Sequence, residues 1–162
     1  MDMLLRRLIP ALVLSFPLHV ATATPIDTGH DLLDAVQAHD GDRFLTLLSD
    51  GLAARMEEGY LRLKEYAETD PSLTDGMLAG MGVSATAAEL SWMSFEDFAG
   101  RVLEGVELPD RGSLLSESAS MKGRDAEVLF AWADGSSLDL RMVWEDSSWR
   151  ITGSSLLAAF FR

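Results

Sequence analysis

The chain contains no cysteine among its 162 residues. This absence excludes disulfide bonds, thiol catalysis, thiolate metal sites and lipid attachment through cysteine. Basic residues are also scarce: 13 lysines and arginines stand against 26 aspartates and glutamates, and the formal net charge is −13 at pH 7. Because such a charge repels nucleic acid and anionic lipid, we expect neither as a partner.

Long apolar runs are missing as well. The stretch from Leu8 to Val20 is shorter than the roughly 20 residues that a membrane-spanning helix requires. It follows Arg6 and Arg7 and precedes the small residues Ala21-Thr22-Ala23, which is the arrangement of a secretory signal peptide. We therefore expect residues 1–23 to be a signal peptide, with export to the bacterial periplasm or the medium and no stable membrane insertion afterwards. The arginine pair also fits a twin-arginine signal, which leaves the export route open.

Residues 24–162 predict a single domain that begins with helices over 28–106. Apolar residues recur there at three- and four-residue spacing, and Asp70-Pro71 ends one helix and starts the next. Three glycines weaken the helical stretch 75–82. Further helix starts are predicted at capping residues, namely Thr28 with Asp31, Asp50, Thr86 with Glu89, and Ser94.

The last part, residues 113–158, predicts a four-stranded antiparallel sheet. A three-residue loop over 133–135 places Gly135 in the left-handed conformation, and this choice pairs Phe130 with Leu138. It also sets Glu127 opposite Arg141 on the other face. The predicted fold class is thus α+β, with N-terminal helices packed on one face of a curved, cone-like four-stranded antiparallel meander.

Two-residue turns at 123–124 and 146–147 bring the remaining strands into line, so that the large apolar residues share the covered face. Two residues break this pattern. Glu117 is expected opposite Phe130, and Gly153 opposite Leu140, where a glycine would leave space. The predicted apolar face comprises Leu115, Ala119, Met121, Val128, Phe130, Trp132, Leu138, Leu140, Met142, Trp144, Trp149 and Ile151.

Two segments carry a resemblance to a known family. They are Leu33-Asp34-Ala35-Val36-Gln37-Ala38-His39-Asp40-Gly41-Asp42-Arg43-Phe44, a helix, a break and a second helix, and the strand pair over 133–151 that ends in Trp149-Arg150-Ile151. The chain resembles the nuclear transport factor two-like superfamily, and in particular its small exported bacterial members of unassigned function. The resemblance implies a curved sheet around a long helix, a cavity between them, and frequent dimers. The glycine-rich segment and the helical insert from about Asp70 to Val106 depart from the family.

Three functions remain open. The leading hypothesis is a non-catalytic domain that binds a small apolar ligand or a protein partner in or on the cone. The alternative is an enzyme of the isomerase or cyclase type, in which Glu117 acts as a base within reach of Tyr60 or Tyr66. The residues expected to line the pocket are Tyr60, Tyr66, Phe130, Trp132, Leu140, Met142, Trp144, Trp149 and Gly153.

The third hypothesis is an interaction module that forms a homodimer through the outer sheet face, which carries Asp139, Arg141, Arg150 and Thr152. His30 and Asp34 lie one helical turn apart, but a metal site needs more ligands than this pair supplies. The sequence contains no nucleophile motif, phosphate-binding loop or zinc spacing. We therefore expect neither a metal nor a cofactor, and the enzyme hypothesis ranks below the binding hypothesis.

Overall fold

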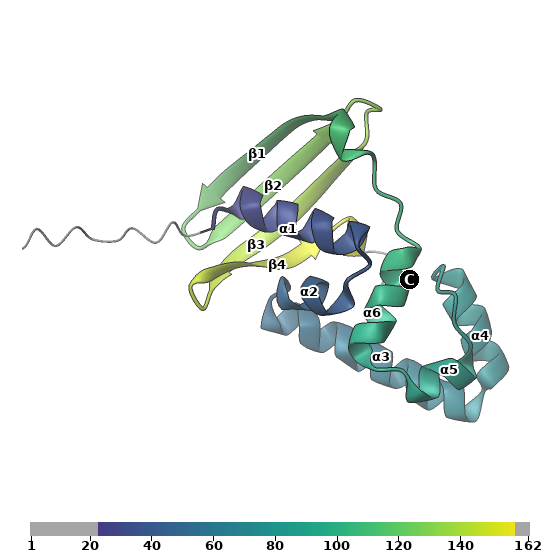
Figure 1. Ribbon diagram of the computed structural model, residues 1–162. Helices are drawn as coiled ribbons and strands as arrows, with labels where there is room; N and C mark the ends of the chain where they lie inside the picture. Colours follow the sequence, from purple (N-terminus) through teal and green to yellow (C-terminus); the bar gives the residue numbers. More distant parts are fainter. Residues whose placement is uncertain (1–22, 158–162) are drawn as a thin grey trace, which may run out of the picture.

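The computed structural model describes residues 23–157, so nearly all of the predicted signal peptide lies outside the described residues. The architecture is α+β, as predicted, with a sheet in the order β1-β2-β3-β4 (Figure 1). Within residues 23–157 no helix is both long and apolar enough to cross a membrane. The elements are α1 (Pro25–Gln37), α2 (Gly41–Thr46), α3 (Asp50–Thr69), α4 (Pro71–Gly80), α5 (Ala87–Trp92), α6 (Phe95–Glu104), the 3₁₀ helix η1 (Arg111–Ser113), β1 (Leu114–Lys122), β2 (Asp125–Trp132), β3 (Ser137–Glu145) and β4 (Ser148–Ser154).

The buried side chains form two clusters. The larger one joins the inner face of the sheet to α1, α2 and the start of α3, with Phe44 and Phe130 among its fully buried members. The second cluster, which includes Leu78 and Leu90, lies among the far half of α3, α4, α5 and α6. Figure 1 shows α1 across the face of the sheet and α2 beside its β4 edge, whereas α4 and α5 pack against α3 away from the sheet. The helical insert noted in the sequence therefore builds most of a separate cluster and leaves part of the sheet uncovered.

Helix α1 begins one turn earlier than predicted. Thr24 is the N-cap, Pro25 is the first helical residue, and Asp27 completes a capping box. The Thr24 N–H donates to Asp27 Oδ2 at 2.7 Å, and the Asp27 N–H donates to Thr24 Oγ1 at 3.2 Å. The predicted cap Thr28 is wrong, because this residue is buried inside α1.

Most of the other predicted N-caps are confirmed. The N-caps Asp70, Thr86 and Ser94 are confirmed at the starts of α4, α5 and α6. For α3, however, the N-cap is Ser49 and not Asp50.

Gly29 lets α1 approach the sheet closely. A Cβ atom at this position would lie 2.7 Å from the ring of Phe130 and 3.3 Å from Leu140 Cδ1. Atoms at such separations clash, so only glycine fits without a shift of the helix. The close approach allows Leu32, Leu33 and Val36 to become buried on the following turns.

The predicted strand register is confirmed over most of the sheet. Gly135 has a φ of 84°, and its N–H donates to the Trp132 carbonyl at 3.0 Å, which closes the three-residue loop. Phe130 pairs with Leu138, and Glu127 pairs with Arg141. The two-residue turns at 123–124 and 146–147 are confirmed as well, because Lys122 pairs with Asp125 and Glu145 with Ser148.

The predicted position of Gly153 is wrong. The register shifts between Arg141 and Met142, so Gly153 pairs with Arg141 and not with Leu140. The cause is a β-bulge, in which β4 carries the extra residue Thr152 between the partners of Met142 and Arg141. Gly153 therefore faces the same side as Arg141, and it leaves no space on the face that the helices cover.

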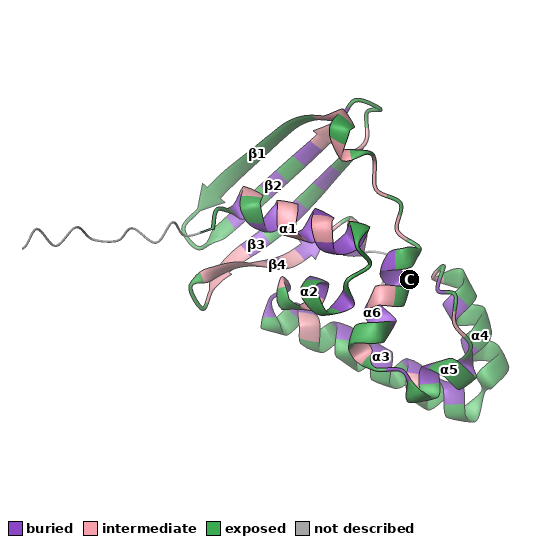
Figure 2. Ribbon diagram, in the orientation of Figure 1, coloured by how far each residue is buried: buried purple, intermediate pink, exposed green. Residues whose placement is uncertain are grey.

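Strand β1 is an edge strand that extends past the helices. Leu115 is 72% exposed and Met121 is 65% exposed, so the prediction that helices bury both is wrong. Leu115 lies at a second register shift, between Leu114 and Ser116. Figure 2 shows β1 exposed along its length, whereas buried and exposed residues alternate along β2.

Replacing Gly29 with alanine tests the contact between α1 and the sheet. We expect Gly29→Ala to lower the free energy of unfolding by about 1–2 kcal/mol, because the new methyl group overpacks the Phe130 ring. The matched control is Gly59→Ala in α3, where a Cβ would meet nothing within 4 Å. This change should raise stability by about 0.5–1 kcal/mol. Urea unfolding followed by circular dichroism measures both, and equal gains for the two variants would contradict the close approach.

Candidate functional site

An apolar groove lies between the start of α1 and the inner face of the sheet. Its volume is about 570 Å³. Its lining comes from the first turn of α1 on one side and from β1, β3 and β4 near their turns on the other. Figure 1 shows the positions of these elements. The lining residues are Ala23, Thr24, Pro25, Ile26, Ala119, Met121, Gly123, Arg124, Trp144 and Trp149.

Two tryptophans form the aromatic part of the floor. Trp144 on β3 and Trp149 on β4 are cross-strand partners, with ring centroids 5.3 Å apart and the rings at 67°. This edge-to-face arrangement is favourable for aromatic pairs. Arg124 holds the end of β3 in place, since its Nε donates to the Trp144 carbonyl at 3.0 Å. The turn at 146–147 thus places the two rings side by side at the groove.

Met121 supplies an adaptable surface opposite this pair. Its side chain faces the helices but extends beyond the part of the sheet that they cover, which explains its large exposure. Ala119 follows two residues away on the same face, and its small side chain leaves room in the groove. Methionine adapts to ligands of different shape because its side chain is unbranched and polarizable.

A polar contact lies next to the groove, at Glu117 on β1. Glu117, two residues beyond Ala119 on the same face, bonds through Oε2 to His30 Nε2 at 2.7 Å. The other ring nitrogen, Nδ1 of His30, lies 2.8 Å from Nη2 of Arg111. A guanidinium group only donates, so Nδ1 accepts and the Nε2–H donates to Glu117 in the tautomer assigned from this network. Both ring nitrogens of His30 are therefore engaged.

The network continues along α1 to α2. Arg111 donates to Asp34, and Arg43 bonds to Asp31 at 2.6 Å. The pair His30 and Asp34, weighed as metal ligands in the sequence, thus holds the guanidinium of Arg111. These side chains are 34–47% exposed, so each ion pair contributes at most about 1 kcal/mol. The network orients α1, η1 and β1 more than it stabilises them.

The two tyrosines that the enzyme hypothesis required lie elsewhere. The hydroxyl of Tyr60 donates to the Met93 carbonyl within the second cluster. Tyr66 is 47% exposed on α3. Among the described residues Glu117 bonds to His30 and to neither tyrosine. The structure therefore does not assemble the carboxylate and tyrosine pair.

The remaining predicted pocket residues fall into three groups. Trp144 and Trp149 line the apolar groove, whereas four others are buried in the core: Phe130, Trp132, Leu140 and Met142. Gly153 lines a different hollow, at the end of β4. Pro25 and Ile26 were not predicted as site residues, because α1 begins one turn earlier than its sequence pattern indicated. The motif Thr24-Pro25-Ile26-Asp27, with proline at the first helical position, is the signal that would have found them.

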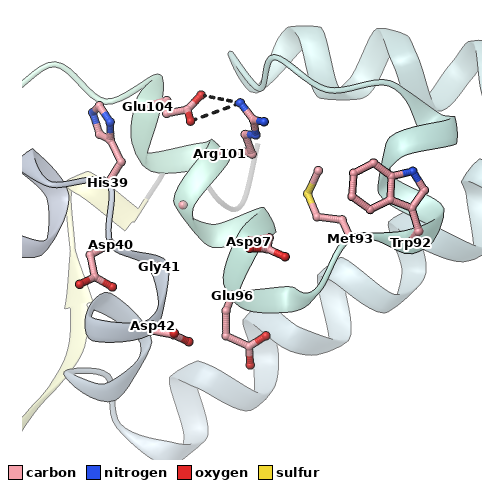
Figure 3. A pocket seen from close by; sticks show the side chains of 11 residues that line it. His39, Asp40, Gly41, Asp42, Trp92, Met93, Glu96, Asp97, Arg101 and Glu104 are labelled. Atoms are coloured by element: carbon pink, nitrogen blue, oxygen red, sulfur yellow. Dashed lines mark hydrogen bonds and ion pairs between the residues drawn. The ribbon is translucent and has the colours of Figure 1, made fainter.

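A second hollow, of about 510 Å³, lies between the start of α2 and α6 (Figure 3). Its shape follows from a close crossing of these helices. A Cβ at Gly41 would overlap the Glu96 carbonyl oxygen and lie 2.7 Å from the Gly100 nitrogen. His39, with a φ of 52°, forms the sharp turn into α2.

Two of the acidic side chains of this hollow have local roles. Asp40 caps α2 by accepting from the Arg43 N–H at 2.9 Å, and Glu104 pairs with Arg101 at 3.3 Å. Figure 3 shows Asp40, Asp42, Glu96, Asp97 and Glu104 spread along the hollow and not directed at one point. Within residues 23–157 no group of three or more such side chains is arranged to hold a metal ion. The apolar groove is therefore the better candidate site.

Comparisons with protein-family models, with curated proteins and with solved structures find no match to this chain. The resemblance to the nuclear transport factor two-like superfamily consequently stays a prediction.

The capping box that forms the groove wall has a measurable signature. Hydrogen bonds from the Thr24 backbone N–H, and secondarily from its hydroxyl, hold the pKa of the Asp27 carboxyl below its ordinary value. A depressed pKa stabilises the fold fully above the unfolded value of about 3.9, and this contribution is lost as pH falls through the folded pKa. We expect a carboxyl ¹³C NMR titration to give an Asp27 midpoint below the ordinary value.

Thr24→Val should raise that midpoint only in part, because the backbone bond remains. The second capping box, Thr86 with Glu89 on α5, is an internal control whose pKa is lowered in the same way. Glu89 should titrate unchanged in the Thr24 variant. An Asp27 midpoint at or above the ordinary value would contradict the geometry of the α1 start.

Proposed function

We propose that this protein is an exported, non-catalytic domain that binds a small, mostly apolar molecule in the groove between α1 and β1. The observation that supports this most is the composition of the groove. The Trp144 and Trp149 rings and the exposed Met121 side chain line the same open apolar surface. Its volume of about 570 Å³ lies in the range typical of small-molecule sites, about 300–1,000 Å³. Export is supported by the signal-peptide pattern of residues 1–23.

The surroundings of the groove favour a neutral ligand. Two indole rings, a thioether and the side chain of Ile26 offer dispersion contacts to a flat or aliphatic molecule. Thr24 and Arg124 at the rim can orient one polar end of it. The net formal charge of the protein, −13, repels anions in general and so disfavours an anionic ligand in this groove.

The hydrogen bonding of the neighbouring polar groups favours binding over catalysis. His30 uses one ring nitrogen for Glu117 and the other for Arg111, so neither nitrogen is open to a substrate proton. Glu117 is 41% exposed, and water surrounds a carboxylate in that position. The second oxygen of the Glu117 carboxylate keeps its lone pairs, but a general base normally also needs shelter from water, and this position does not offer it.

Nile red, a neutral fluorescent probe, tests the groove in the protein purified after export. We expect saturable binding with a Kd below about 100 µM and energy transfer from tryptophan to the probe. Met121→Glu should weaken binding at least tenfold, because the probe would bury a charge against the indole rings. The matched control is Leu115→Glu, an exposed residue of the same strand outside the groove, which should change the Kd less than twofold.

Both variants must keep the far-ultraviolet circular dichroism of the wild type, so that a lost fold is not mistaken for a lost site. Solvent extraction of the purified protein followed by mass spectrometry would then identify a bound natural molecule. Equal affinities for Met121→Glu and the wild type, or an absence of saturable binding, would refute the proposal.

A further inference from the structure

Two arginines converge on a third hollow, between the start of α3 and the end of β4. It has a volume of about 400 Å³ and is lined by Leu52, Arg55, Arg141, Thr152, Gly153, Ser154 and Leu157. Within residues 23–157 neither Arg55 nor Arg141 forms an ion pair, although acids outnumber bases 26 to 13 in the chain. Both arginines are exposed and line the same hollow, so two cations without an acidic partner are available there to an anion from solution.

The bulge in β4 makes space for the guanidinium group of Arg141. A Cβ at Gly153 would lie 2.7 Å from Arg141 Nη2 and 3.1 Å from both Cζ and Nε. The guanidinium plane therefore lies directly against the Gly153 backbone, in space that any side chain would fill. Thr152 fixes the bulge, since its hydroxyl donates to the Arg141 carbonyl at 3.1 Å.

Arg141 also has an acid that it does not use. Glu127 is its direct cross-strand partner on the outer face, the position from which opposite charges normally pair. In the described structure the guanidinium lies instead over β4, and the two residues form no ion pair. The expected surface pair between Glu127 and Arg141 is thus replaced by a guanidinium directed at the hollow.

We propose that this hollow binds a small organic oxyanion, a carboxylate or a phosphate, between Arg141 and Arg55. The planar donor fork of arginine matches the two oxygens of either group. Ser154 adds a neutral donor: its Oγ accepts from the Leu156 N–H at 3.1 Å, so its own hydrogen remains available. Leu52 and Leu157 give the hollow an apolar side, which suits an anion that carries a hydrocarbon group.

This site is independent of the apolar groove. The two share no lining residue, and Gly153 and Arg141 face the outer side of the sheet whereas Met121 faces the inner side. The failure of one proposal therefore leaves the other standing, and the neutral probe Nile red does not report on the oxyanion site.

Isothermal titration calorimetry at low ionic strength, with inorganic phosphate and with benzoate, tests the proposal on the full exported protein. We expect saturable binding of at least one of them. Gly153→Ala is the sharpest variant, because it keeps every charge and only displaces the Arg141 guanidinium, the mobile end of a long side chain. It should weaken binding at least tenfold, whereas its control Gly59→Ala should bind like the wild type.

Two charge variants complete the design. Arg55→Gln should also weaken binding at least tenfold, and its control Arg62→Gln removes an exposed arginine of the same helix that pairs with Glu58. Arg62→Gln should change the Kd less than twofold. Preference for benzoate or for phosphate identifies the class of oxyanion. Three results would overturn the proposal: an equal loss of affinity in Arg55→Gln and in its control Arg62→Gln, wild-type affinity in Gly153→Ala, or no saturation below about 10 mM anion.

Discussion

At Gly29 the backbone of α1 lies against the ring of Phe130, at a separation that leaves no room for a side chain. The next residue, His30, packs edge-to-face on the same ring, with centroids 5.3 Å apart. Phe130 is also the cross-strand partner of Glu117. One contact therefore sets the height of α1, brings His30 to Glu117, and leaves the first turn of α1 beside β1, where the apolar groove forms.

The floor of this groove could be predicted from the sequence because its determinants are local. Gly135 selects the loop length of the central hairpin, and the loop length decides which residues of β2 and β3 share a face. The turn at 146–147 then pairs Trp144 with Trp149 by the same rule. Because side chains alternate along a strand, the face of each further residue follows from the turn, and no contact distant in the sequence is needed to predict it.

Long-range packing could not be predicted in the same way. Tyr60 has the spacing of a core residue of α3, yet its hydroxyl bonds to Met93 because α4 and α5 fold back on the far half of that helix. Glu117 lies on the inner face of the sheet, as a base in a pocket would, but its partner His30 is 87 positions away in the sequence. Neither periodicity nor capping identifies which helix turn meets which strand, so the site residues were predicted less well than the sheet.

The end of β4 shows how a small register error changes a functional interpretation. Thr152, Gly153 and Ser154 include no large apolar side chain, so nothing in their pattern indicates which face each residue takes. With a regular strand, Gly153 would open space beneath the helices. With one extra residue in β4 it opens the same space on the opposite face, and the Arg141 guanidinium occupies it. The premise that glycine leaves room was correct, but the bulge turns that room to the outer face, where it holds the side chain of Arg141 beside the hollow that Arg55 also lines.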